Sequence, residues 1–304
     1  MSTLYRRVRS FGGRGWRSLK RRAGGAQRRL TAVSTTSRTR AGEIRDETRW
    51  NVANLRGRHG IFRIEALNGT PNPDAMPVIM CLWNRPGRID DILAQLDAQT
   101  SERPVRLLLW NNKPEDDAHY RERISAFTRS GALQSVEYVR SPLNVGAMGR
   151  FYLARQLFRA QYRGHFITLD DDQDIQPTFV EIMQRYAKPH EFAGYWAWNY
   201  IDSHWNRTQT APGELADYAG TGGAICDIAI VESTAFFTEI PRRFAFLEDQ
   251  WLCGYAKSLG WQIRKADVDI TFVLHETNQF PHLADLKDEF RLYLIDRNAG
   301  RLKQ

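Results

Sequence analysis

The sequence has few cysteines and no long apolar run. These two shortages argue against disulfide-stabilised, zinc-cluster and membrane-spanning proteins. Its 304 residues include only Cys81, Cys226 and Cys253, which lie far apart and show no paired spacing. This spacing argues against a disulfide framework and against a cysteine zinc site, so we expect a cytoplasmic protein. No run approaches the roughly 18 apolar residues of a membrane span, and we expect neither a transmembrane helix nor a secretory signal.

Acidic residues are missing from residues 1–40, which contain twelve Lys or Arg. Subtracting these twelve charges from the net charge of +8 leaves −4 for the rest of the chain. We expect the arm to be disordered, or to form an amphipathic helix on contact, because it has too little apolar surface to offset the entropy of ordering. An anionic membrane surface is the partner we favour, which would place the protein at the inner face of a membrane. Nucleic acid is the less favoured partner, and a solvated tail is the alternative to both.

Four apolar runs alternate with helical patterns after a transitional linker over residues 41–75. The runs are Pro77–Trp83, Val105–Trp110, Val136–Val139 and Phe166–Leu169. Strands that alternate with helices predict an α/β fold with a mainly parallel, Rossmann-like sheet flanked by helices. We expect one domain over residues 76–280 and a helical tail over residues 281–304.

The second half of this domain has a less regular pattern. Strands are expected at Phe192–Trp198 and Ile270–Leu274, and a helix is expected over Leu247–Gly260. Glu248 and Asp249 then lie in the first helical turn, where the helix dipole favours anions. The glycine cluster Gly220–Ala224 indicates either a close approach of the backbone to a ligand or a loop that needs positive φ angles.

Each of the four expected strands ends in polar residues. They are Asn84-Arg85, Asn111-Asn112, Asn144 and Asp170-Asp171-Asp172. Ligands of doubly wound sheets bind beyond the carboxyl ends of the strands, so we expect these residues to surround one crevice. Several carboxylates at one strand end repel one another unless a cation lies between them, which favours a metal or phosphate site over a solvated acidic turn.

The motifs occur in an order that resembles glycosyltransferases of the GT-A fold and the large family 2. Asp170 and Asp172, with the proline that follows, resemble the DxD motif of that family. Trp83-Asn84-Arg85 resembles the end of its first strand, Asn111-Asn112 the acidic pair after its second, and Asn144 to Arg150 its Asn-x-Gly segment. Glu248-Asp249 resembles the pair that supplies the catalytic base. The similarity spans about residues 76–275.

The resemblance implies transfer of a sugar from a nucleoside-diphosphate sugar to an acceptor hydroxyl, with inversion at the anomeric carbon. It implies Mn²⁺ or Mg²⁺ at Asp172 and Asp170, with His275 as a further ligand that would favour Mn²⁺. Asp249 is the expected base and Glu248 its alternate. The donor nucleotide is expected to contact a larger set: Trp83, Asn84, Arg85, Asn111, Asn144, Arg150, Asp170 and Asp171.

Departures from that family keep other interpretations open. Asn111 replaces an acidic residue, which weakens the case for uracil, and the arginine motif downstream of Asp249 is not recognisable. The acceptor therefore stays unassigned. The alternatives are a sugar-nucleotide nucleotidyltransferase, although only one glycine follows the first strand, and a scaffold without catalysis whose basic arm binds nucleic acid. A scaffold has no use for Asp170, Asp172 and Asp249 together.

Overall fold

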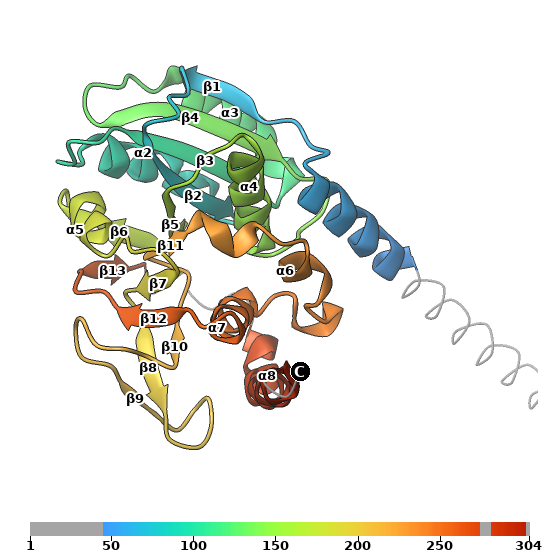
Figure 1. Cartoon of the computed structure of the whole chain (residues 1–304). Helices are drawn as coiled ribbons and strands as arrows, with labels where there is room; N and C mark the ends of the chain where they lie inside the picture. Colours follow the sequence, from blue (N-terminus) through green and yellow to red (C-terminus); the bar gives the residue numbers. More distant parts are fainter. Residues whose placement is uncertain (1–44, 274–280, 302–304) are drawn as a thin grey trace, which may run out of the picture. The chain divides into compact units, whose positions relative to one another are not determined.

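The computed structural model describes residues 45–273 and 281–301 of the chain (Figure 1). The chain divides into two compact units, Met1–Val52 and Ala53–Gln304. Of the first unit, the structure describes only residues 45–52, which are helical and belong to a helix over residues 45–59. The expected basic arm and His275 lie outside the described residues. Within the described ranges, no helix has the length and apolar character needed to cross a membrane.

The second unit is built on an eight-stranded sheet with the order β1-β4-β3-β2-β5-β11-β7-β12. Its strands are β1 (Glu65–Gly69), β2 (Met76–Leu82), β3 (Val105–Asn111), β4 (Leu133–Arg140), β5 (His165–Asp170), β7 (Glu191–Gly194), β11 (Ala224–Asp227) and β12 (Gln262–Lys265). Only β1 and β11 run against the other strands of this sheet. The expected α/β fold with a mainly parallel sheet is confirmed.

The helices that follow β1 include some on each face of this sheet. They are α2 (Ile89–Asp97), α3 (Asp117–Ala126), α4 (Met148–Arg159), α5 (Phe179–Arg185), α6 (Ala235–Thr238), α7 (Glu248–Ser258) and α8 (Lys287–Arg301). Helix α8 packs on α7. Helices α2, α3 and α5 share one apolar core with alternate residues of β2 and β3, such as Met80 and Leu109. Helix α4 packs on the opposite face against β2 and β3 (Figure 1). A side chain at Gly149 of α4 would overlap the Trp110 ring, so glycine permits this close contact.

The central strand β2 was predicted from the sequence and the edge strand β1 was not, because the two strands differ in burial. All seven residues of β2 are buried, which explains its continuous apolar run. Strand β1 is an antiparallel edge strand that pairs with β4, and its residues are intermediate or exposed. Because its sequence Glu-Ala-Leu-Asn-Gly has one large apolar residue, the pattern predicted a linker over residues 41–75. That stretch instead contains the helix over residues 45–59 and a strand of the main sheet.

Two smaller sheets make up the irregular half. Strands β10 (Tyr218–Ala219), β8 (Ala197–Tyr200) and β9 (Arg207–Gln209) form one sheet, and β6 (Gln173–Ile175) pairs with β13 (Ile270–Phe272). The single strand expected over Phe192–Trp198 is divided between β7 and β8, which belong to different sheets. The chain turns at Tyr195, whose N–H donates to the Gly223 carbonyl.

The strand order places a topological switch point between β2 and β5. From β2 the chain proceeds outward to β3 and β4, then returns to β5 on the other side of β2. The connections leave the two strands in opposite directions, which opens a crevice beyond their carboxyl ends. The residues after Leu82 and at Asp170 border this crevice.

Candidate active site

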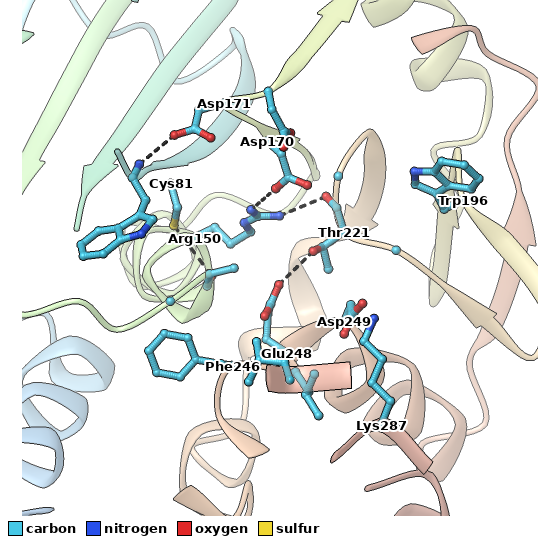
Figure 2. A pocket seen from close by; sticks show the side chains of 18 of the residues that line it. Cys81, Arg150, Asp170, Asp171, Trp196, Thr221, Phe246, Glu248, Asp249 and Lys287 are labelled. Atoms are coloured by element: carbon cyan, nitrogen blue, oxygen red, sulfur yellow. Dashed lines mark hydrogen bonds and ion pairs between the residues drawn. The ribbon is translucent and has the colours of Figure 1, made fainter. Parts of the chain in front are cut away.

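A cavity of about 740 Å³ lies beyond the carboxyl ends of β2 and β5. One side, the strand-end wall, contains Trp83, Arg85, Arg150, Asp170, Asp171 and Asp172. A second group of lining residues, the tryptophan wall, contains Trp196, Trp198, Trp205, Arg207, Tyr218 and Phe272. Glu248, Asp249 and Lys287 also line the cavity. Figure 2 shows Asp170 and Asp171 on one side and Glu248 and Asp249 on the other, with Arg150 and Thr221 between them.

Arg85 holds two of the three strand-end carboxylates. Its Nη1 donates to Asp171 Oδ1 at 2.7 Å, and its Nη2 lies 3.1 Å from Asp172 Oδ2. The Trp83 N–H donates to the other Asp171 oxygen at 2.7 Å. Burial raises the pKa of Asp171 to about 7, against the lowering effects of this N–H and of Arg85. Burial and the neighbouring Asp170 raise the pKa of Asp172 to about 6.

Arg150 holds the third carboxylate and links it to the glycine-rich segment. Its Nη2 donates to Asp170 Oδ1, and its Nη1 donates to the Thr221 carbonyl at 3.2 Å. The Thr168 hydroxyl donates to the same carbonyl at 2.5 Å. A side chain at Gly222 would place its Cβ 2.2 Å from Asp170 Oδ2. This glycine therefore lets the backbone pass directly beside the carboxylate.

Glu248 and Asp249 begin helix α7 but occupy different environments. Glu248 is buried and accepts a hydrogen bond from the Thr221 hydroxyl at 3.1 Å. Burial raises its pKa to about 7, and the charge of Asp249 adds to that effect. Asp249 is only half-buried, and its Oδ2 accepts a hydrogen bond from the Tyr218 hydroxyl. Of this pair, Asp249 is the more accessible from the cavity.

Indole rings stack along the tryptophan wall. The rings of Trp196 and Trp198 lie 5.8 Å apart with planes 11° from parallel, and Phe272 lies 5.5 Å from Trp196. The Arg207 guanidinium is 4.7 Å from the Trp198 ring and donates to His204 Nε2 at 2.8 Å. Burial lowers the pKa of His204 to about 3, so this histidine is neutral.

The structure brings nine of the twelve residues expected at the site to the cavity. They are Trp83, Arg85, Asn144, Arg150, Asp170, Asp171, Asp172, Glu248 and Asp249. Asn84 is exposed and does not line the cavity, and His275 lies outside the described residues. Asp174, in the same acidic segment, does not line the cavity and accepts hydrogen bonds from Arg88 and Gln95.

Asn111 is fully buried and does not line the cavity, contrary to its expected position at the crevice. Its amide donates to the Tyr138 hydroxyl at 2.8 Å, and its carbonyl oxygen accepts the Lys113 N–H. Asn112, the residue directly after β3, lines the cavity in its place. The Asn112 amide donates to the Gly146 carbonyl at 2.9 Å.

The sequence did not assign roles to several residues of the cavity. The i, i+2 spacing of Trp196 and Trp198 is the signal that could have placed both rings on one strand face, and Thr221 lies within the glycine cluster Gly220–Ala224. Trp205 and Lys287 had no such signal, because chain segments distant in sequence bring them to the cavity. Tyr218 was equally unmarked, since β10 has only two residues.

The carboxylate oxygens at the cavity could supply part of the coordination shell of a metal ion, with a bound ligand and water supplying the rest. Asp170 and Asp172 supply hard oxygen atoms, and their repulsion contributes to the raised pKa of Asp172. Over residues 45–273 and 281–301, no cluster of three His, Cys, Asp or Glu side chains is placed to hold a metal ion. A Mg²⁺-type ion bound by one or two carboxylates completes its shell with water and phosphate oxygens.

No protein-family model matches the chain, and no curated protein matches it. Among solved structures, the chain is similar to residues 1–349 of TarS from S. aureus, with 14% sequence identity and a TM-score of 0.42. The match covers 64% of this chain and 59% of that chain.

Proposed function

We propose that this protein is a metal-dependent glycosyltransferase that moves a sugar from a nucleoside-diphosphate sugar to an acceptor hydroxyl. One observation carries the proposal: a single cavity at the switch point of the sheet unites the strand-end carboxylates with a second carboxylate at the start of α7. Glycosyl transfer needs both groups, one to support a diphosphate leaving group and one to remove a proton from the acceptor.

The strand-end wall is the proposed donor site. Asp172 and Asp170 would hold a Mn²⁺ or Mg²⁺ ion, which as a Lewis acid would neutralise charge on the leaving diphosphate. Arg85 and Arg150 are buried, cavity-lining cations and supply further positive charge for the phosphates. The half-buried Trp83 ring offers a face on which the base stacks.

Asp249 is the proposed general base. It lines the cavity from the first turn of α7, and the Tyr218 hydroxyl fixes one of its oxygens while the other accepts the Gln250 N–H at 2.7 Å. Glu248, in contrast, is bonded to Thr221 inside the protein and supports the wall. A single base that activates an acceptor for in-line attack inverts the anomeric centre.

Nucleotide binding by an Asp172→Ala variant tests the donor site, and Asp174→Ala is its matched control. A ligand at about 100 times its Kd stabilises the native state by about 2.7 kcal/mol, which raises the Tm by several degrees. We expect at least one nucleoside diphosphate with Mn²⁺ to have this effect on the wild type and on Asp174→Ala. Asp172→Ala should lose this effect together with sugar-nucleotide turnover.

Two outcomes would contradict the proposal. One is a wild-type Tm that no nucleoside diphosphate raises, with or without Mn²⁺. The other is an Asp172→Ala variant that responds and turns over sugar nucleotides as the wild type does. Asp174 makes the control informative because it belongs to the same acidic segment but binds Arg88 and Gln95 away from the cavity.

A further inference from the structure

The cavity is lined by three arginines and a lysine whose charges are balanced to different degrees. Arg85 and Arg150, on the strand-end wall, are each paired with aspartates. Arg207, on the tryptophan wall, donates a hydrogen bond to the neutral ring of His204. A neutral partner does not balance the positive charge of Arg207. Lys287 also lines the cavity, with its Nζ 5.7 Å from the Trp205 ring. Among the described residues, neither cation has a carboxylate within ion-pair distance.

Trp205 combines this charge with an apolar surface. It follows β8 in the turn before β9, lines the cavity and is 58% exposed. His204, the residue before it, is fully buried, and its N–H donates to Asp288 Oδ1 at the start of α8. The buried histidine thus anchors the turn from which the exposed indole projects. An exposed tryptophan at a cavity contributes most when a flat, partly apolar ligand covers it.

A sugar ring has the surface that this wall complements. Its C–H faces are apolar and suit an indole face, while its hydroxyl edge needs hydrogen-bond partners. Arg207 presents fixed donors whose geometry matches a carboxylate or a phosphate. Asp249, the proposed base, lines the same cavity. Its hydrogen-bond partner is Tyr218, and the centre of the Tyr218 ring lies 5.6 Å from the Arg207 guanidinium carbon.

We propose that the tryptophan wall binds the acceptor and that the acceptor is an acidic carbohydrate. Its sugar ring stacks on Trp205, and a carboxylate or phosphate group on that sugar is bound by Arg207 and Lys287. This inference deepens the proposed function, because it names the class of acceptor that brings a hydroxyl group to Asp249. Phosphate and carboxylate share the charge that these cations recognise, and the probes below separate them.

Direct binding of small probes tests this assignment without knowledge of the natural acceptor. Dissociation constants of glucuronic acid, glucose 6-phosphate, glucose and glycerol 3-phosphate are measured by calorimetry or ligand-observed NMR. Each is measured with and without a nucleoside diphosphate. We expect one or both acidic sugars to bind at least tenfold more tightly than glucose and than glycerol 3-phosphate. Preference between the two acidic sugars identifies the anionic group.

Variants with matched controls assign the binding to this wall. Trp205→Ala and Arg207→Gln should each weaken acidic-sugar binding tenfold or more, and Arg207→Lys should recover only part of it, because lysine keeps the charge but not the paired donors. Ile201→Ala removes an exposed apolar side chain of the same turn that does not line the cavity. Arg185→Gln removes an exposed arginine of α5. Both controls should bind as the wild type does.

The results separate failure of this inference from failure of the proposed function. Equal binding of glucose and the acidic sugars would overturn the anionic part, and equal binding of glycerol 3-phosphate would reduce the wall to a simple anion site. Unchanged affinity in Trp205→Ala would overturn the stacking part. Nucleotide binding that depends on Asp172 without acidic-sugar binding overturns only this inference. Acidic-sugar binding without any nucleotide binding overturns only the proposed donor site.

Discussion

The side chains of the two walls of the cavity are held in place by different interactions. On the strand-end wall, buried arginines pair by charge with aspartates at the ends of central strands. On the tryptophan wall, rings pack on rings in a small sheet and its turns, and one indole is mostly exposed. Charge-paired groups on a rigid sheet hold one geometry, whereas ring surfaces in turns can accept ligands of different outline. The difference fits a fixed chemical task on one wall and a selective task on the other.

Replacing the carboxylate between the two walls should have the largest effect. Asp249→Asn keeps the size of the side chain and an oxygen that accepts from Tyr218, but it removes the proposed base. A positioned general base contributes about 10²- to 10⁴-fold, so kcat for transfer should fall by that factor. Steady-state kinetics with a sugar nucleotide and an acceptor measures it. Nucleoside-diphosphate affinity should stay near the wild-type value if Asp249 acts only on the acceptor. A larger loss of kcat in Glu248→Gln would instead assign the base to Glu248.

Glu248 makes the stability of the protein depend on pH. Its pKa is raised from 4.5 to about 7 in the folded state, so the folded state binds more protons than the unfolded state between these values. The free energy of unfolding therefore decreases as pH rises through this range. At about 1.4 kcal/mol per pKa unit, the decrease is at most about 3.5 kcal/mol.

Urea unfolding at pH 5 and pH 8 measures this contribution. Glu248→Gln stays neutral and retains an oxygen for Thr221, so its loss of stability between the two pH values should be smaller than that of the wild type. Glu181→Gln, on the surface of α5, is the matched control and should keep the wild-type difference. The same pH difference in all three proteins would show that burial does not perturb Glu248.

The strand-end wall was largely predictable from sequence, because each central strand is a continuous apolar run whose polar end marks the crevice. Even there, one residue of register decided between Asn111 and Asn112. The side chain of Asn111 faces the core that contains Tyr138, and that of Asn112 faces the cavity. A sequence pattern shows where a strand ends but not which face its last residue occupies.

The tryptophan wall depends on long-range pairing that the local pattern does not encode. The apolar run Phe192–Trp198 reads as one strand, yet it divides because Tyr195 bonds to Gly223 while Ala197 opens a second sheet. Trp205 reaches the cavity only because His204 is anchored to Asp288, more than 80 residues later. Both features follow from contacts between distant segments, so periodicity alone could not place them.

The Gly222→Ala variant tests whether nucleoside-diphosphate binding at the donor site needs the close packing of the backbone beside Asp170. An alanine Cβ would lie 2.2 Å from Asp170 Oδ2 and 2.7 Å from Gln173 Nε2, so both side chains must move. Gly222→Ala should weaken Mn²⁺-dependent nucleoside-diphosphate binding about tenfold, which corresponds to about 1.4 kcal/mol. Gly87→Ala is the control, because a Cβ there meets nothing within 4 Å. Equal affinity in the two variants would indicate that Asp170 shifts at no cost to binding.

Tyr218 links the tryptophan wall to Asp249, and loss of its hydroxyl should have an effect as small as that of Gly222→Ala. Tyr218→Phe keeps the buried ring beside Arg207 but removes the donor to Asp249. The carboxylate loses one of its two orienting hydrogen bonds, so we expect kcat to fall about tenfold, as the loss of about 1.4 kcal/mol of positioning implies. KM for the sugar nucleotide should not change, because the hydroxyl lies away from the strand-end wall. Tyr120→Phe is the control, since the buried Tyr120 hydroxyl has no hydrogen-bond partner among the described residues. A parallel rise in KM would show that Tyr218 shapes the donor site and does not act through Asp249 alone.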